Sequence, residues 1–167
     1  LAGRALKLEA ATETYTDTAT LFLPARLSRF AERHDNFRLY KAMAAHLWAQ
    51  TRYGSLRLPS GAAPLAETLA AYREPEKALR LFHALETVRL NARIEHELPG
   101  LYRDMREIQR LTGEVRYPDA WKHATQLLTG PEATVADSLA LLPRLREGET
   151  PTPFCFQGVL LPDRAHR

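Results

Sequence analysis

One stretch constrains the fold more than any other: the segment from Pro75 to Leu98 contains no glycine and no proline after its first residue. Its apolar residues recur at helical spacings of three and four, at Ala78, Leu81, Phe82, Leu85, Val88 and Ala92. This period predicts a long helix over 75–98 with a broad buried face. Pro75 suits the first turn, and Pro99-Gly100 ends the segment. Such a helix needs partners, which favours a helical domain.

Shorter segments with the same period flank it. We expect a helix over 36–52, capped by Asp35 or Asn36, with a buried stripe at Phe37, Tyr40, Met43, Leu47 and Gln50. A short helix is predicted over 64–72. Further helices are expected from Leu101 to a stop at Gly113, from Pro118-Asp119 to Gly130, and from Pro131 onward.

The N-terminal part reads differently. Residues 12–23 are rich in threonine and precede Pro24, which favours a hairpin turning near Thr16-Asp17. Residues 5–11 are too short to assign. The predicted fold class is therefore mainly α, with a small N-terminal β-hairpin or strand pair. We expect a helical domain over 1–146, and a proline-rich segment over 147–167 that forms a strap around Phe154-Cys155-Phe156 or a linker.

Composition excludes several classes of protein. The 167 residues are 45% hydrophobic and 26% charged, which fits one globular domain. The net charge of +3 is too small to indicate nucleic-acid binding by itself. Cys155 is the only cysteine, so no internal disulfide or multi-thiolate metal site can form. No apolar run approaches a membrane span. We expect a cytoplasmic setting and, because the chain begins Leu1-Ala2-Gly3-Arg4, a larger protein around it.

Motifs for chemistry are scarce. Neither GxxxxGK[ST] nor GxGxxG occurs, so a nucleotide would have to be bound by another chain. His46 and Gln50 lie one helical turn apart, but Gln50 stands where a zinc peptidase has its second histidine, and Leu47 where it has its glutamate. Glu86 and Glu95 could supply a further ligand. A metallopeptidase-like site, functional or degenerate, stays an alternative; a hydrogen-bonded His46 in a helix interface is favoured.

The remaining polar patterns favour structural roles. Glu86, Arg89 and Arg93 follow the apolar face of the long helix, and we expect one of these arginines to point inward with Glu86. Arg103, Arg106 and Arg110 form a basic stripe, but Asp104 and Glu107 alternate with them, so ion pairs explain the pattern better than nucleic-acid binding. We expect no catalytic residue, bound metal or cofactor, and treat His46, Gln50, Glu86, Arg89 and Arg93 as structural or interaction residues.

Three stretches carry a family resemblance. The first runs from Thr20-Leu21-Phe22-Leu23-Pro24 through Arg29-Phe30 to Asp35-Asn36-Phe37-Arg38-Leu39-Tyr40-Lys41. The second is Met43-Ala44-Ala45-His46 with Arg52-Tyr53-Gly54-Ser55-Leu56. The third is Leu85-Glu86, Arg89-Leu90-Asn91-Ala92-Arg93-Ile94 and Leu98-Pro99-Gly100-Leu101. Their order resembles the region upstream of the von Willebrand factor A domain in the CbbO/NorD family, and more distantly the cobalt-chelatase subunit CobT. Asn91 departs from the acidic residue expected there.

The resemblance covers about residues 15–105 and implies a partner of a MoxR-type AAA+ ATPase hexamer. A CbbO-like protein would be the adaptor of a Rubisco activase that works with a CbbQ-type ATPase. A NorD-like protein would serve nitric oxide reductase maturation with a NorQ-type ATPase. We expect a non-catalytic adaptor domain of the CbbO-like kind, with the NorD-like role as the alternative. The family's metal-binding DxSxS motif is missing from this sequence.

Overall fold

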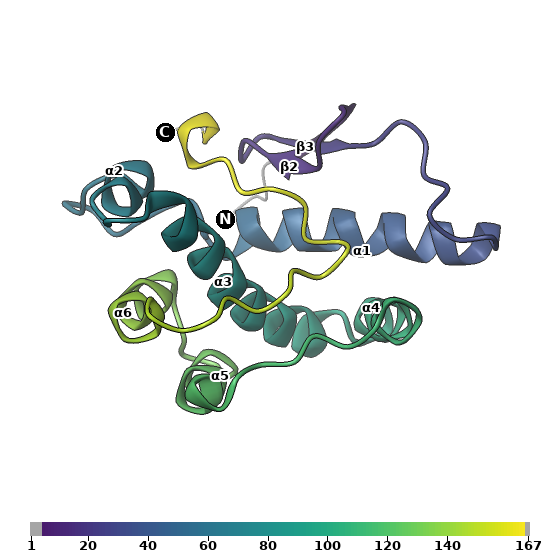
Figure 1. Ribbon diagram of the computed structural model, residues 1–167. Helices are drawn as coiled ribbons and strands as arrows, with labels where there is room; N and C mark the ends of the chain where they lie inside the picture. Colours follow the sequence, from purple (N-terminus) through teal and green to yellow (C-terminus); the bar gives the residue numbers. More distant parts are fainter. Residues whose placement is uncertain (1–4, 166–167) are drawn as a thin grey trace.

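A computed structural model describes residues 5–165, and it confirms the predicted fold class. In this part of the chain, helices dominate and one small sheet lies near the N-terminus (Figure 1). The α-helices are α1(Arg33–Arg52), α2(Leu65–Ala70), α3(Pro75–Glu97), α4(Pro99–Thr112), α5(Lys122–Leu128) and α6(Val135–Leu145), with 3-10 turns η1(Asp119–Trp121) and η2(Pro162–Arg164). Both ends of the predicted domains, residues 1–4 and 166–167, lie outside the described residues.

The sheet has strand order β1-β3-β2, formed by β1(Lys7–Ala10), β3(Thr20–Leu23) and β2(Tyr15–Thr16). Strands β2 and β3 pair antiparallel, so the predicted hairpin exists, and its turn follows Thr16. The side chain of Asp17 accepts the backbone N–H groups of Ala19 and Thr20, which closes the turn. Strand β1 pairs parallel to β3 and exposes all of its residues, so its sequence carries no burial pattern.

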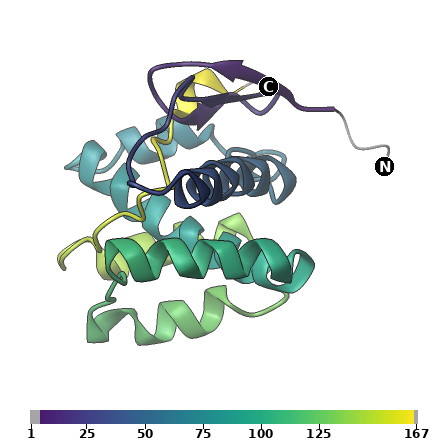
Figure 2. The same cartoon turned by 90° about the vertical axis from the view of Figure 1, so that its right-hand side faces the viewer.

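Helix α3 is the centre of the fold and contacts α1, α2, α4, α5 and α6. Its N-terminal half packs with α2, α5 and α6 around Phe82, Leu85 and Trp121. Its C-terminal half packs with α1, α4 and the sheet around Leu90 and Ile94. Viewed from the side, the sheet covers α1 on one face, while α4 and α5 lie beyond its opposite face (Figure 2).

The start of α1 differs from the prediction. The helix begins at Arg33 after Glu32, so Asp35 and Asn36 are not its cap. Asn36 instead accepts the backbone N–H of Phe30 and donates to its carbonyl, which fixes the approach of the loop. The predicted buried position Phe37 is wrong, because its side chain is 61% exposed and Lys41 lies over its ring. Leu39, two positions later, is fully buried, so Phe37 lies on the side of α1 that faces away from the core.

The last helices also begin later than predicted. The segment after Pro118 starts with the 3-10 turn η1, and α5 follows from Lys122. Helix α6 begins at Val135 rather than at Pro131, because Thr134 and Asp137 form a capping box there. The Asp137 carboxylate accepts the backbone N–H of Thr134 at 2.8 Å.

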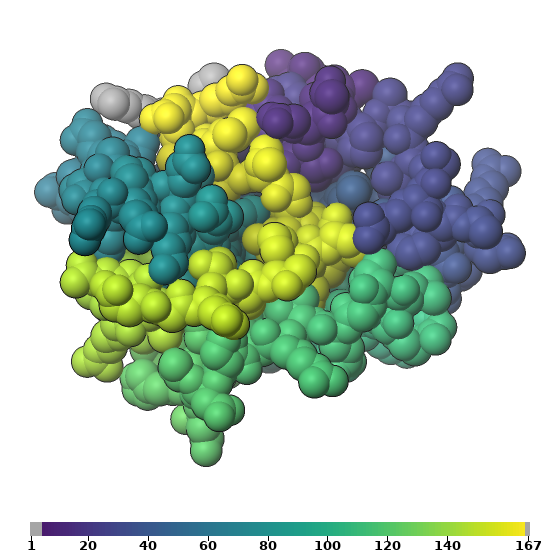
Figure 3. Space-filling view, viewed as in Figure 1, coloured from purple at the N-terminus to yellow at the C-terminus, as the bar shows by residue number. Residues whose placement is uncertain are grey.

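The chain after α6 lies across the body of the molecule (Figure 3). We call residues 150–161 the strap. Its Phe156, Gln157 and Leu160 are buried, and the backbone N–H of Val159 donates to the carbonyl of Thr14 at 2.9 Å. Gly158 has a φ of +65°, and a Cβ there would overlap the Thr14 carbonyl oxygen, so glycine permits this close approach. Within residues 5–165, no helix is long and apolar enough to cross a membrane.

Candidate functional site

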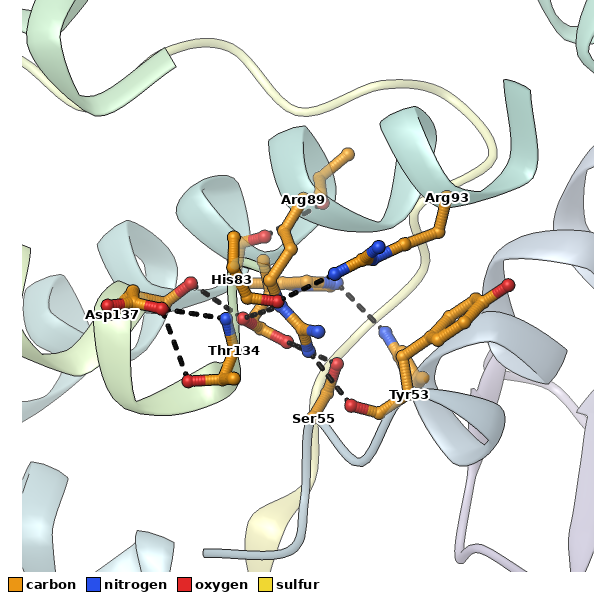
Figure 4. A network of polar contacts seen from close by, with 12 residues as sticks. Tyr53, Ser55, His83, Arg89, Arg93, Thr134 and Asp137 are labelled. Atoms are coloured by element: carbon orange, nitrogen blue, oxygen red, sulfur yellow. Dashed lines mark hydrogen bonds and ion pairs between the residues drawn. The ribbon is translucent and has the colours of Figure 1, made fainter. Parts of the chain in front are cut away.

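A buried carboxylate joins three parts of the chain. Glu86, which is only 1% exposed, accepts hydrogen bonds from Ser55 Oγ at 2.5 Å, from Ser138 Oγ at 2.6 Å, and from both Nε and Nη2 of Arg89 at 2.9 and 2.6 Å. Figure 4 shows Ser55 and Arg89 within this network of polar contacts. Ser55 follows α1, and Ser138 lies on α6. One buried side chain therefore ties the end of α1 and the middle of α6 to α3. We call Glu86, Arg89, Ser55 and Ser138 the carboxylate network.

Arginines extend the network toward neighbouring backbone groups. Arg89 Nη2 also donates to the Tyr53 carbonyl at 3.1 Å, at the C-terminus of α1. Arg93 donates to the Ala133 carbonyl at 2.9 Å, just before the capping box of α6, and its guanidinium lies over the Tyr53 ring. Arg89 is therefore the inward partner of Glu86, while Arg93 bonds to backbone.

The geometry of the carboxylate network indicates a structural role. Each carboxylate oxygen of Glu86 has two donors, which uses the lone pairs that a substrate or a proton would need. A buried ion pair adds little net stability, but removing one partner leaves an uncompensated charge. The network therefore fixes one arrangement of three helices and leaves no free base.

A second buried polar cluster lies between α1 and α3. The Nε2 atoms of His46 and His83 are 3.2 Å apart, and the Gln50 amide nitrogen lies 3.0 Å from the first and 3.3 Å from the second. We call these three residues the His-His-Gln triangle. His46 is fully buried, and its Nδ1 and the Gln50 Oε1 have no hydrogen-bond partner.

Burial governs the titration of both imidazoles. Desolvation, and secondarily the neighbouring His83, lowers the pKa of His46 well below its usual value. Desolvation lowers the pKa of His83 to about 3. Both rings are therefore neutral near pH 7.

His83 was not predicted to join this cluster. The available signal was its place on α3, where Leu90 and Ile94 follow it on the face that packs against α1. A polar residue on that face opposite His46 and Gln50 indicates a buried pair. Which of the polar residues on α3 faces α1 depends on the crossing of the two helices, which periodicity does not fix.

The structure does not bring Glu86 and Glu95 together with His46 as a metallopeptidase-like site would require. Glu86 is enclosed by the carboxylate network, and Glu95 is exposed on the last turns of α3. Neither carboxylate has a hydrogen bond to His46. Among the described residues, no group of three or more histidine, cysteine, aspartate or glutamate side chains could hold a metal ion.

The basic stripe of α4 is mostly paired. Arg110 pairs with Glu107 at 2.6 Å, as expected, while Arg106 pairs with the more distant Glu114 at 3.0 Å. Asp104 differs from the expectation, because it pairs with Arg38 and Lys41 of α1. Burial alone would raise the pKa of Asp104, but hydrogen bonds from Lys41 and Arg38 hold that pKa below its ordinary value. Asp104 therefore contributes to holding α1 against α4.

An open cleft lies between α3, α4 and the segment leading into α5. Its volume is about 460 Å³, and its walls include Asn91, Tyr102, Tyr117 and Lys122. The Asn91 Oδ1 atom is buried without a hydrogen-bond partner. Burial raises the pKa of Tyr117 to about 12, so this phenol is protonated at neutral pH. No side chain on these walls is arranged as a nucleophile with a base.

Cys155 lies on the strap and is half-buried near Thr112. Burial is the main cause that raises the pKa of its thiol, which makes the thiolate rarer at neutral pH. This environment suits a packing role rather than a nucleophile.

No family model, curated protein or solved structure matches this chain.

Proposed function

We propose that this chain is a non-catalytic helical scaffold domain, of the kind found in CbbO-like adaptors of MoxR-type AAA+ ATPases. One observation carries the proposal. The residues of the three stretches that resemble the CbbO/NorD family gather in space and hold the fold together. They supply packing and buried hydrogen bonds rather than an arrangement of groups that could react.

Many apolar members of these stretches share one core, while Leu56 and Leu85 lie in the cluster around the N-terminal half of α3. Leu21 and Leu23 of the sheet, Leu39 and Met43 of α1, and Leu90 and Ile94 of α3 are buried in the same cluster, with Leu101 of α4 packed against it. The three stretches therefore describe one unit, formed by β3, α1, α3 and the start of α4.

Several polar members have partners as well. The Tyr53 carbonyl, Ser55, Glu86 and Arg89 meet in the carboxylate network. Tyr40 donates to the Pro24 carbonyl at 2.8 Å, within the first stretch. A sequence pattern with these partners specifies a rigid block, and a rigid block suits a module that transmits force between an ATPase and its target.

The target within this proposal is Rubisco, with nitric oxide reductase as the second candidate. Both candidates come from the resemblance. The ATPase would bind its nucleotide in its own chain, since this sequence contains no phosphate-binding loop.

A binding experiment tests the proposal. The chain is immobilised and exposed to a CbbQ-type hexamer with ATP, ADP or no nucleotide, to Rubisco, and to a NorQ-type hexamer. We expect saturable binding of the CbbQ-type hexamer or of Rubisco. Ser60→Ala, in an exposed loop, serves as the control that retains binding, and Leu85→Asp, in the core, as the control that abolishes it.

Preference for the NorQ-type hexamer would move the assignment to the NorD-like role. Absence of binding to all of these proteins, by a chain shown to be folded by circular dichroism, would overturn the proposal.

A further inference from the structure

The three edges of the His-His-Gln triangle cannot all be hydrogen bonds at the same time. Its three edges measure 3.2, 3.0 and 3.3 Å, and its side chains are buried between α1 and α3. An imidazole nitrogen either donates or accepts, and the end of an amide facing a site is either a donor nitrogen or an acceptor oxygen. A hydrogen bond along an edge needs one donor and one acceptor. The Gln50 amide nitrogen carries two protons and can donate to both imidazoles, which leaves the 3.2 Å edge between the two Nε2 atoms without a hydrogen bond. Three atoms with one role each cannot alternate around a triangle, so one edge always joins two donors or two acceptors.

A cation would remove this conflict. If the Gln50 amide is turned by 180°, its oxygen takes the place of its nitrogen, and all three corners can act as acceptors. Two lone pairs then come from neutral imidazoles and the third from an amide oxygen. The turn directs Gln50 Oε1, which has no hydrogen-bond partner in its present place, toward the ligand, and it moves the amide nitrogen out of the triangle.

The spacing suits a metal ion. From the three edges, the point equidistant from the corners lies about 1.8 Å from each atom. An ion with ligand distances of about 2.0–2.1 Å would lie about 1 Å out of the plane of the triangle. A water molecule needs about 2.8 Å to each partner and has only two protons for three acceptors.

We propose that His46, His83 and Gln50 form a binding site for a first-row transition-metal ion, represented by Zn²⁺. Imidazole nitrogen suits Zn²⁺, Cu²⁺, Co²⁺ and Ni²⁺, whereas Mg²⁺ and Ca²⁺ prefer sites made of oxygen ligands alone. This site is independent of the adaptor function, and either proposal can fail without the other.

The surroundings define what the ion would do. His46 and Gln50 lie on α1 and His83 on α3, so an ion would fasten the two central helices to each other. The Phe156 ring of the strap lies 5.9 Å from the His46 ring, so the strap restricts entry. Neutral ligands and the unpartnered His46 Nδ1 predict weaker binding than a site with thiolates or with carboxylate-supported histidines.

The test uses the purified chain, refolded with either Zn²⁺ or Co²⁺ and then passed through a desalting column. We expect about one retained ion per chain, a visible Co²⁺ absorption band, and a higher melting temperature than that of the chelator-treated protein. Gln50→Leu is the informative variant because it keeps a side chain of similar volume and removes the amide that forms one corner of the triangle. We expect it to bind at least tenfold more weakly and, without metal, to melt no lower than the wild type.

His46→Ala and His83→Ala should lose the ion, and His96→Ala and His123→Ala, on exposed side chains, should retain it. If a core histidine variant fails to fold, Gln50→Leu still decides the question. A wild-type chain that retains no ion, or ion retention equal in Gln50→Leu and the wild type, would overturn the proposal.

Discussion

Ser138 Oγ of α6 donates a 2.6 Å hydrogen bond to Oε1 of Glu86, a residue of α3 that precedes it by 52 positions. The same carboxylate accepts Ser55, which follows α1. This relationship joins segments that are far apart in the sequence through one buried charge. It also provides the first prediction.

Replacing Ser138 by alanine should destabilise the chain by about 1–3 kcal/mol, because Glu86 loses a donor that water cannot replace in the core. Urea unfolding at pH 7 measures the change in the free energy of unfolding. Ser60→Ala is the matched control, since this serine is exposed in the loop before α2. Equal stability of Ser138→Ala and Ser60→Ala would show that the bond does not contribute.

Acid should destabilise the fold through its buried histidines. The pKa of His83 is about 3 in the folded chain and about 6.5 when unfolded, so the unfolded state binds more protons below pH 6.5. Stability is therefore retained above pH 6.5 and falls as the pH drops from there toward 3. For one such histidine, the loss between pH 7 and pH 5 is about 2 kcal/mol.

The measurement is the free energy of unfolding between pH 7 and pH 5 in metal-free buffer. His83→Leu should reduce the slope, and His123→Leu, on an exposed side chain, is the matched control. A slope that is the same for His83→Leu and the wild type would contradict the assignment of this pH dependence to His83.

Gly158 should be the most restrictive glycine of the strap. Alanine there combines a positive φ with an overlap against the Thr14 carbonyl, so Gly158→Ala should cost more than 2 kcal/mol and release the strap from the sheet. Gly61 also has a positive φ but has open space around it, so Gly61→Ala should cost only about 1 kcal/mol. Thermal unfolding, with hydrogen exchange at Val159, distinguishes the two. An equal loss of stability in Gly158→Ala and Gly61→Ala would contradict a role for the close approach of Gly158 to Thr14.

Asp104 should link α1 to α4 in a salt-dependent way. Asp104→Asn removes the ion pairs with Arg38 and Lys41, and we expect a loss of about 1 kcal/mol at low salt that shrinks with added NaCl. Glu107→Gln, which breaks the more exposed pair with Arg110, should have a smaller effect. The comparison is made by urea unfolding at two salt concentrations. A larger effect for Glu107→Gln would contradict this assignment.

The sequence predicted a helix well where the spacing of its apolar residues agrees with the positions of proline and glycine at its ends. The range 75–98 differs from α3 by one residue, because Pro75 and Pro99-Gly100 set its ends. Prediction failed where side chains override these signals. Thr134 and Asp137 moved the start of α6, and β1 is recruited by backbone pairing to β3 without any buried side chain.

The polar core was only partly predictable. The pairing of Glu86 with an arginine follows from their spacing on one helix, and the structure shows that the partner is Arg89. Ser55, Ser138 and His83 come from other elements, and their meeting depends on how those elements cross. Phe37 was also predicted wrongly, because the buried face of α1 contains Leu39 and His46 and leaves Phe37 on the opposite side of the helix.

The central claim is that the carboxylate network holds the scaffold and performs no reaction. The most direct test replaces the whole network at once, with Ser55→Ala, Glu86→Leu, Arg89→Met and Ser138→Ala in one chain, because apolar residues of similar volume can replace a buried ion pair. The measured quantity is the affinity for the partner found in the binding experiment, together with cooperative thermal unfolding. The account predicts a folded chain with an affinity within about threefold of the wild type. A chain that unfolds cooperatively but no longer binds or supports its partner would contradict it.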